Sequence, residues 1–307
     1  ITLGCPKNLV DAEVMLGLLD EAGHALVASP EGADLAIVNT CSFIASAVEE
    51  SREVVGSCLD LKAHGLLGAV LVAGCLPQRY GNDVFAMLPG VDGVVGCSNV
   101  QDIAEVVFRV ASGEAVAEVH EPEFLYDDTT PRVLGTPGHL AYVKISEGCD
   151  NRCAYCMIPS IRGRLRSRNA ESIRREVEDL ASAGVREVNL IAQDTTAYGT
   201  DIASEGDLAE LLRQLDSTAI DWVRLLYTHP AHLTTDVIDA VASLPSVVPY
   251  IDIPIQHVSD RVLLAMGRGT DGARIRALFG QVRSRVPGVF IRSSVIVGSV
   301  SYTHLRA

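Results

Sequence analysis

The sequence predicts an α/β protein: an N-terminal doubly wound parallel-sheet domain followed by part of a β/α barrel. Three observations carry this prediction. Short apolar strands alternate with amphipathic helices, an acidic stretch with prolines interrupts the alternation once, and the alternation then resumes. Parallel neighbours need crossover connections, so such alternation is typical of parallel sheets covered by helices. At 307 residues the chain is long enough for both domains.

The first domain is expected over residues 1–112. Its apolar runs predict buried strands at 25–29, 34–40, 68–74 and 91–96. Amphipathic segments that end at glycines predict helices at 10–23, 44–65 and 102–113. The following segment, 113–138, is acidic, holds three prolines and lacks a sustained period, which indicates a linker.

The second domain is expected over residues 139–298. Its apolar runs predict strands at 141–146, 186–193, 222–228, 249–255 and 289–298. Helices are predicted at 170–184 and 233–244, the latter capped by Thr234 or Thr235. Five strand–helix units favour a partial β/α barrel, whose chemistry lies at the C-terminal ends of its strands.

Composition narrows the function classes. The 25 basic and 39 acidic residues give a net charge of −14, which disfavours broad contact with nucleic-acid phosphates, DNA included, and favours a basic protein partner. No apolar run approaches the roughly 18–20 residues that span a bilayer, so we expect a cytoplasmic protein without membrane association. Eight cysteines in such a chain indicate metal or redox chemistry more than disulfides.

A cysteine-rich loop follows the predicted strand 141–146. Cys149, Cys153 and Cys156 have the spacing C-x3-C-x2-C, which lets one loop bind three irons of a cubane 4Fe–4S cluster. The fourth iron would be open to a non-protein ligand. A zinc site is the alternative, but zinc sites usually pair two short Cys or His couples.

A second set of three cysteines is spread through the first domain. Cys5, Cys41 and Cys75 each stand where an apolar segment ends. The carboxyl ends of parallel strands share one edge, so the topology would gather the three thiols there. Chance placement of buried cysteines is the alternative, and it fits Cys58 and Cys97 better.

The loop at 146–168 resembles that of the radical S-adenosylmethionine (SAM) enzymes, and the aromatic Tyr155 also fits that family. Two three-cysteine sets in this order resemble the methylthiotransferases. Within that group, "LGCPKNLVDAE" and "GCDNRCAYCMIPSIRGRLRSR" are similar to RimO-type enzymes, whereas MiaB-type tRNA enzymes usually show a "YGCQMN"-like stretch at the first cysteine.

The resemblance implies two 4Fe–4S clusters and SAM as cofactors. It implies that Cys149, Cys153 and Cys156 hold the catalytic cluster and that Cys5, Cys41 and Cys75 hold an auxiliary, sulfur-handling one. An electron from the catalytic cluster would cleave SAM to methionine and a 5′-deoxyadenosyl radical that abstracts hydrogen from the substrate.

The implied reaction adds a methylthio group to the β-carbon of an aspartate in ribosomal protein uS12. Partners would be uS12 or the small ribosomal subunit, and an electron donor such as a flavodoxin. Two alternatives stay open: a MiaB-type methylthiotransferase of tRNA adenosine, and a non-catalytic iron–sulfur or zinc-binding protein.

Polar residues at the ends of later strands are further candidates for binding SAM or substrate, because barrel enzymes place ligand contacts there. They are Gln193, Asp194, Thr228, His229, Gln256 and His257. A purely structural hydrogen-bonding role is the alternative for each pair. Four arginines after the loop could bind a carboxylate of SAM or substrate, or could cap the loop: Arg162, Arg164, Arg166 and Arg168.

The end of the chain departs from the pattern of the rest. Residues 299–307 lack an apolar period and a capping signal, so we expect them to be foreign to the protein. The barrel is then expected to be incomplete, and the C-terminal substrate-docking domain typical of the family to be absent.

Overall fold

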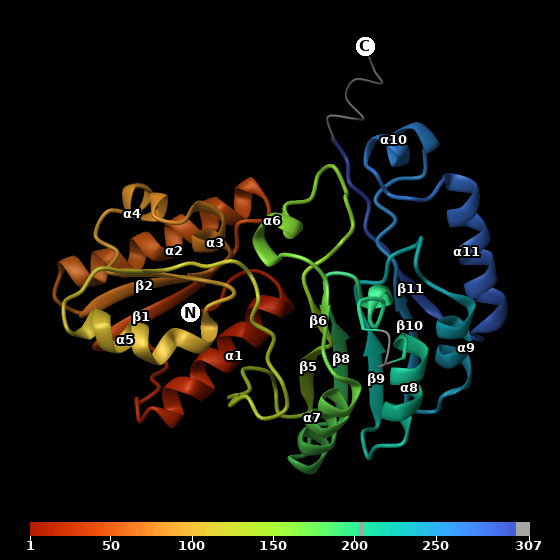
Figure 1. Cartoon of the computed structure of the whole chain (residues 1–307), viewed down its shortest axis with the longest axis horizontal. Helices are drawn as coiled ribbons and strands as arrows, with labels where there is room; N and C mark the ends of the chain where they lie inside the picture. Colours follow the sequence, from red (N-terminus) through yellow and green to blue (C-terminus); the bar gives the residue numbers. More distant parts are fainter. Residues whose placement is uncertain (203–205, 299–307) are drawn as a thin grey trace. The chain divides into compact units, whose positions relative to one another are not determined.

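The computed structural model describes residues 1–202 and 206–298, which form two compact units (Figure 1). One unit holds Ile1–Gly135 together with Ser160–Arg164, and the other holds Thr136–Pro159 and the described chain from Leu165 onward. Each unit contains one parallel sheet with helices packed on it.

The sheet of the first unit contains four parallel strands in the order β1-β2-β3-β4. They are β1 (Leu35–Thr40), β2 (Ala69–Gly74), β3 (Gly93–Gly96) and β4 (Val116–Glu118). The first three confirm predicted strands. The fourth lies inside 113–138, so the segment expected to be a linker contributes a strand to this sheet.

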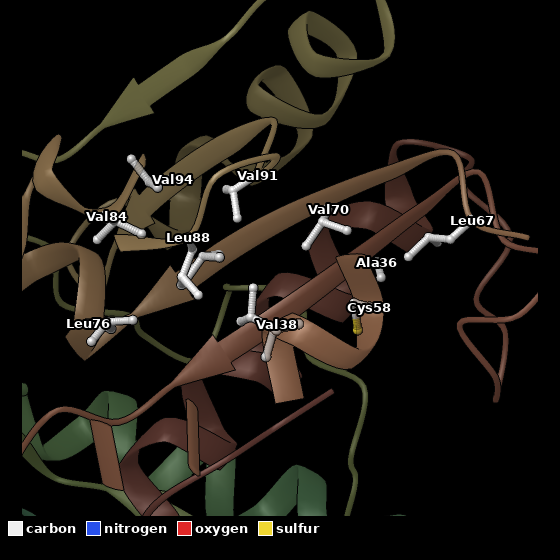
Figure 2. Packing of buried hydrophobic residues seen from close by; sticks show 12 residues of the cluster. Ala36, Val38, Cys58, Leu67, Val70, Leu76, Val84, Leu88, Val91 and Val94 are labelled. Atoms are coloured by element: carbon white, nitrogen blue, oxygen red, sulfur yellow. The ribbon is translucent and has the colours of Figure 1, made fainter. Parts of the chain in front are cut away.

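Helices cover both faces of this sheet, which confirms the doubly wound prediction (Figure 1). One face carries α2 (Ala45–Ala63), α3 (Cys75–Tyr80) and α4 (Asp83–Met87), and the other carries α1 (Pro6–Glu21) and α5 (Ile103–Ala111), which follows a short 3₁₀ helix, η1 (Val100–Asp102). Figure 2 shows alternate strand residues such as Val38, Val70 and Val94 packing on one face against Cys58 of α2 and Leu88 beyond α4. This alternation follows from the two-residue period of a strand.

The strand predicted at 25–29 is wrong. Residues 24–29 are irregular and exposed, with 40% of Leu26 and 66% of Val27 accessible to solvent. The edge of β1 that faces away from β2 pairs instead with the first residues of the chain: Asn39 N donates to Ile1 O (2.8 Å) and Leu3 N donates to Asn39 O (2.9 Å). An apolar run becomes a strand only where a backbone partner is available, and here the N-terminal residues take that place.

The later part of the expected linker is fastened to α1. The buried carboxylate of Glu13 binds Arg132 Nη2 (2.6 Å) and accepts from Gly135 N (2.8 Å). A Cβ atom on Gly17 would lie 2.4 Å from the carbonyl carbon of Pro131, so only glycine permits the close approach of these segments. Residues 131–135 are therefore part of the first unit.

The sheet of the second unit contains five parallel strands in the order β11-β10-β9-β8-β5. They are β5 (Leu140–Lys144), β8 (Glu187–Ile191), β9 (Trp222–Leu225), β10 (Val247–Asp252) and β11 (Phe290–Arg292). All five match predicted strands, and each is shorter than predicted. Among the described residues, the strands of this all-parallel sheet follow sequence order from β5 to β11, as in the expected partial β/α barrel.

The helices between these strands complete the strand–helix units. They are α7 (Ala170–Ser182), α8 (Leu208–Asp216), α9 (Thr235–Ser243), α10 (Asp260–Ala265) and α11 (Gly272–Arg285), with a 3₁₀ helix η2 (Thr195–Ala197) after β8. Thr234 is the N-cap of α9, as predicted, because its hydroxyl accepts from Val237 N. The short antiparallel pair β6 (Ser146–Glu147) and β7 (Arg166–Ser167) brackets the cysteine loop and α6 (Ile158–Arg162).

None of the described helices is long and apolar enough to cross a membrane. The expectation that residues 299–307 are foreign falls on positions outside the described residues.

Replacing Leu88 by alanine should destabilise the first unit by about 2–5 kcal/mol, because this side chain is 6% exposed and fills the core of Figure 2. Leu66→Ala is the matched control, since Leu66 is 44% exposed and its truncation should cost about 0.5 kcal/mol or less. Urea-induced unfolding followed by circular dichroism measures both, and equal effects would contradict this assignment of the core.

Candidate metal centres

The structure brings Cys5, Cys41 and Cys75 together at the carboxyl edge of the first sheet. Cys41 directly follows β1, Cys75 directly follows β2, and Cys5 is the N-cap of α1. A Cβ on Gly4, whose φ is +90°, would lie 2.8 Å from Cys41 Cβ, so a glycine is needed where the Cys5 segment meets Cys41. Burial raises the pKa of Cys41, and negative charge on Cys75 and Cys5 raises it further, as expected of neighbouring thiols.

Two buried amides fasten this edge. Asn8 Nδ2 donates to Thr40 O (2.8 Å), and Asn39 Nδ2 donates to Asn8 O (2.7 Å), which joins α1 to the end of β1. Asn8 Oδ1 also accepts from Cys75 Sγ (3.5 Å). Sequence reasoning missed both residues. Their positions beside cysteines, in "CPKN" and "VNTC", are the signal that could have found them.

Arg162 lies in the first unit and is 2% exposed. Its guanidinium binds Asp11 Oδ2 (2.7 Å) and Asn8 Oδ1 (2.6 Å), and Nη2 lies 3.5 Å from Cys75 Sγ. A guanidinium already bound to a protein carboxylate favours the structural interpretation over capture of a SAM carboxylate. Arg168 is held in the same way in the second unit, by Glu176 (2.5 Å).

A fourth thiol, Cys97, lies beside Cys75. It directly follows β3, is 5% exposed, donates to Ile161 O (3.4 Å) and forms a hydrogen bond with Cys75. This hydrogen bond and the charge of Arg162 lower the pKa of Cys75 against the effect of burial, and burial raises that of Cys97. Cys97 is buried as predicted, but it belongs to the edge that holds the triad. Cys58 lies in the core, as predicted (Figure 2).

The second triad lies in the loop between β6 and α6. Cys149, Cys153 and Cys156 are half-buried, and none forms a disulfide. Backbone N–H groups point at two of the sulfurs: Asn151 N donates to Cys149 Sγ (3.4 Å) and Ile158 N to that of Cys156. Burial raises the pKa of Cys149 to about 11 and also raises that of Cys156. Such thiols ionise readily only when a metal or another cation is present.

Tyr155 lies within this loop and is half-buried. Its hydroxyl forms a hydrogen bond with Cys153, and burial is the main reason why its pKa is raised. The phenol therefore stays neutral beside the sulfur.

Asp194, which lies between β8 and η2, joins the cysteine loop to the next strand end. Its Oδ2 accepts from Asn151 Nδ2 (2.8 Å) and His232 Nδ1 (2.7 Å), and its Oδ1 accepts from Thr196 N (3.1 Å). Burial would raise the pKa of Asp194, but the hydrogen bonds from His232 and Thr196 prevail and lower it. Neighbouring Gln193 donates to buried Glu147. His232 was not among the predicted residues, although the "THPAH" pattern contains it.

His229 and His232 stack, with ring centroids 4.6 Å apart, yet carry opposite pKa shifts. Burial and the charge of Arg268 lower the pKa of His229 to about 4, whereas the hydrogen bond to Asp194 raises that of His232. His229 Nδ1 accepts from Ala231 N (3.2 Å), so the neutral ring carries its proton on Nε2. Ligand atoms of Asp194, His229 and His232 lie within 4.8 Å of one another, close enough for a shared metal ion. Neighbouring Thr228 donates to Asp252 O (2.6 Å).

Gln256 and His257 follow β10. Gln256 has a φ of +67°, a conformation that non-glycine residues adopt mainly at strained, often functional positions. His257 Nδ1 accepts from Ser259 N (2.9 Å), which shapes its own loop. The structure thus connects Asp194 and His229 through shared partners, and places Gln256 and His257 at a neighbouring strand end.

Two buried polar atoms at these strand ends, Gln193 Oε1 and His229 Nε2, have no hydrogen-bond partner among the described residues, and neither has Nε of Arg268, in the turn after α10. Buried polar groups are normally satisfied, so such atoms indicate a ligand with both donors and acceptors. SAM has both. Together with three clustered thiols, this donor set fits a 4Fe–4S cluster that binds a polar cofactor.

Replacing Asp194 by asparagine should lower the pKa of His232 towards the ordinary histidine value, because the carboxylate that favours the protonated ring is removed. His229 should stay neutral at about pH 6, since its pKa is about 4. The raised pKa of His232 also means that its pairing stabilises the fold at low pH and loses effect as pH rises through that value. Nuclear magnetic resonance titration of the ring protons measures this. Asp239→Asn is the control and should leave the pKa of His232 unchanged. If Asp194→Asn also leaves it unchanged, the assignment is contradicted.

Two family models match this chain. Residues 1–96 match the model of the Uncharacterized protein family UPF0004, and residues 143–298 match that of the Radical SAM superfamily.

Similar proteins include two named "Ribosomal protein uS12 methylthiotransferase RimO". The one from Heliobacterium modesticaldum is 48% identical over 97% of this chain, and the one from Syntrophomonas wolfei is 46% identical over 97%. The chain spans 65% of the length of the first relative and 68% of the second.

Solved structures show the fold. The radical SAM methyltransferase TsrM from Kitasatospora setae, with cobalamin and a [4Fe–4S] cluster bound, has a TM-score of 0.61 at 17% identity, over 92% of this chain and 60% of that one. The cobalamin-dependent radical SAM enzyme OxsB has a TM-score of 0.56 at 12% identity, over 94% and 43%. On its sequence relatives and its family match, the chain belongs to the radical SAM superfamily and, within it, to the RimO family of ribosomal protein uS12 methylthiotransferases.

Proposed function

We propose that this chain is the cluster-bearing part of a SAM-dependent methylthiotransferase that acts on an aspartate of ribosomal protein uS12. The observation that carries the proposal is the presence of two thiol triads, one at the edge of the first sheet and one in the loop after β6, in a chain 46–48% identical to enzymes of that name. The chain spans 65% of the first relative, so its activity and substrate are inferred for the whole protein.

The cofactors follow from the family and the donor sets. The radical SAM match covers Cys149, Cys153 and Cys156, and this family implies one 4Fe–4S cluster and SAM. We assign a second cluster to Cys5, Cys41 and Cys75, with residues 1–112 as the auxiliary domain and 139–298 as the radical SAM core. When bound, the cluster held by Cys149, Cys153 and Cys156 together with SAM would supply radical chemistry capable of activating a C–H bond of the substrate aspartate.

The residues of this chain hold that chemistry in place. Asp194 fixes the cysteine loop through Asn151, and its hydrogen bond raises the pKa of its partner His232. Neutral His229 offers Nε2–H to a cofactor or substrate acceptor, and Gln193 offers Oε1 to a donor. Tyr155, Thr228, Gln256 and His257 complete the residues proposed to surround SAM.

The second candidate is methylthiolation of tRNA adenosine with the same machinery. The net charge of −14 favours a basic protein substrate such as a ribosomal protein over an RNA. The names of the similar proteins support the same choice. A flavodoxin-like electron donor and a cytoplasmic location accompany the proposal.

Two cubane clusters predict about eight irons per chain after anaerobic reconstitution. Cys153→Ala should abolish SAM cleavage and leave the first-unit cluster detectable by its own spectrum. Cys58→Ala is the control, because Cys58 lies in the core and away from either triad, so the full iron content should remain. Iron analysis and electron paramagnetic resonance measure both. Zinc in place of iron under strictly anaerobic preparation would refute the cluster assignment.

The substrate prediction is tested with the full-length enzyme, given uS12 and tRNA together. The proposal expects a mass increase from a methylthio group on a uS12 peptide and unmodified tRNA. Methylthio groups on tRNA adenosine alone would instead support the second candidate.

A further inference from the structure

Arg268 lies in a turn that directly follows α10. Arg268 stands between two glycines with positive φ, Gly267 (+66°) and Gly269 (+63°). Gly267 N donates to Leu264 O (3.0 Å), which ends α10, and Arg268 N donates to Leu263 O (3.1 Å). These glycines allow the chain to reverse sharply, so the arginine is presented on a short, fixed turn.

This turn is attached to the cysteine loop. Ala154 N, between Cys153 and Cys156, donates to Met266 O (2.9 Å). A Cβ on Gly267 would lie 2.8 Å from Arg152 O, so the two backbones are in close contact. The position of Arg268 is therefore fixed relative to the sulfurs.

The guanidinium of Arg268 points into this loop and is 5% exposed. Nη1 donates to Cys153 Sγ (3.5 Å) and Nη2 to Pro254 O (2.7 Å), while Nε has no partner. Among residues 1–202 and 206–298, no carboxylate forms an ion pair with it. A buried charge without an opposite charge is costly.

Other buried arginines of the chain have such partners. Arg162 binds Asp11 (2.7 Å), Arg168 binds Glu176 (2.5 Å) and Arg132 binds Glu13 (2.6 Å). Arg268 differs in that its guanidinium donates to the sulfur of Cys153, a group that would carry negative charge on binding a metal. Ligation of iron by three thiolates would supply the missing negative charge.

We propose that Arg268 is a positioning residue that neutralises the cluster held by Cys149, Cys153 and Cys156 and thereby raises its reduction potential. The inference rests on the proposed function, since it requires a cluster at this triad. Hydrogen bonds to sulfur and nearby charge set cluster potentials, and a cation favours the more negative, reduced state. Removing the charge should therefore make the cluster harder to reduce.

The test uses a background with Cys5, Cys41 and Cys75 replaced by alanine, so that only this cluster contributes to the signal. Redox titration followed by electron paramagnetic resonance compares Arg268→Gln with the control Arg213→Gln, an exposed arginine paired with Glu210. At a fixed potential, the ratio of reduced to oxidised cluster should fall at least tenfold in Arg268→Gln, a shift of ~59 mV for one electron, and stay unchanged in the control.

Arg268→Lys keeps the charge but not the two-armed contact, so its ratio should fall by a smaller factor, about threefold. If the glutamine variant does not bind iron, Arg268→Ala, which also removes the charge, carries the test, and an alanine-variant midpoint equal to that of the parent would overturn the proposal. A glutamine variant with an intact cluster, an unchanged midpoint and weakened SAM binding would show that Arg268 pairs with the SAM carboxylate instead. Failure of the parent chain to bind iron would overturn the proposed function itself.

Discussion

Both sheets rely on one constraint: parallel strands all end at the same edge. The hydrogen-bonded register of β1 and β2 runs to Thr40 and Gly74, so the residues that follow, Cys41 and Cys75, emerge side by side. No local sequence motif could join cysteines 34 positions apart; the sheet does it. In the second unit the same constraint places the residues after β8 and β9 within hydrogen-bonding distance, as the Asp194–His232 contact shows. Other features of the two sites depend on these edges.

Burying thiols at such an edge creates an electrostatic problem that the chain solves differently in its two units. Burial disfavours a thiolate, as the raised pKa of Cys149 shows. In the first unit Arg162 lies beside Cys75, and its charge is balanced by Asp11. In the second unit Arg268 lies beside Cys153 without a carboxylate partner in the described chain. Among the described residues, the second triad therefore has an unpaired guanidinium beside Cys153, and the negative charge of Asp194 acts on Cys149.

Much of the fold could be predicted because it depends on local pattern. The strands at 34–40, 68–74 and 91–96 are short apolar runs that end at Thr, Gly and Gly, and the structure pairs them in sequence order. The run at 25–29 has the same composition but no available edge, since Ile1–Leu3 pair with β1, and a pairing choice of this kind is not encoded locally. β4 was missed because three residues inside an acidic segment carry too little pattern.

The position of Cys41 and Cys75 at one sheet edge could also be predicted, whereas much of their surroundings could not. Cys41, Cys75 and Cys97 all follow strands, but only Cys41 and Cys75 were predicted to be site residues. The link of Cys97 to the site is its hydrogen bond with Cys75, which only the structure shows. Asn8, Arg162 and Arg268 reach their sulfurs from 67, 87 and 115 positions away along the chain. Such contacts arise from tertiary packing, which periodicity and spacing do not report.

The central claim is that the thiols of Cys149, Cys153 and Cys156 bind a cubane cluster with one iron left open for SAM. Mössbauer spectroscopy of chain reconstituted with ⁵⁷Fe, with and without SAM, tests it most directly. The account predicts that SAM changes the isomer shift of a single iron site, and that the Cys153→Ala variant loses this response while the first-unit cluster remains. Identical spectra with and without SAM, in a chain that holds both clusters, would contradict it.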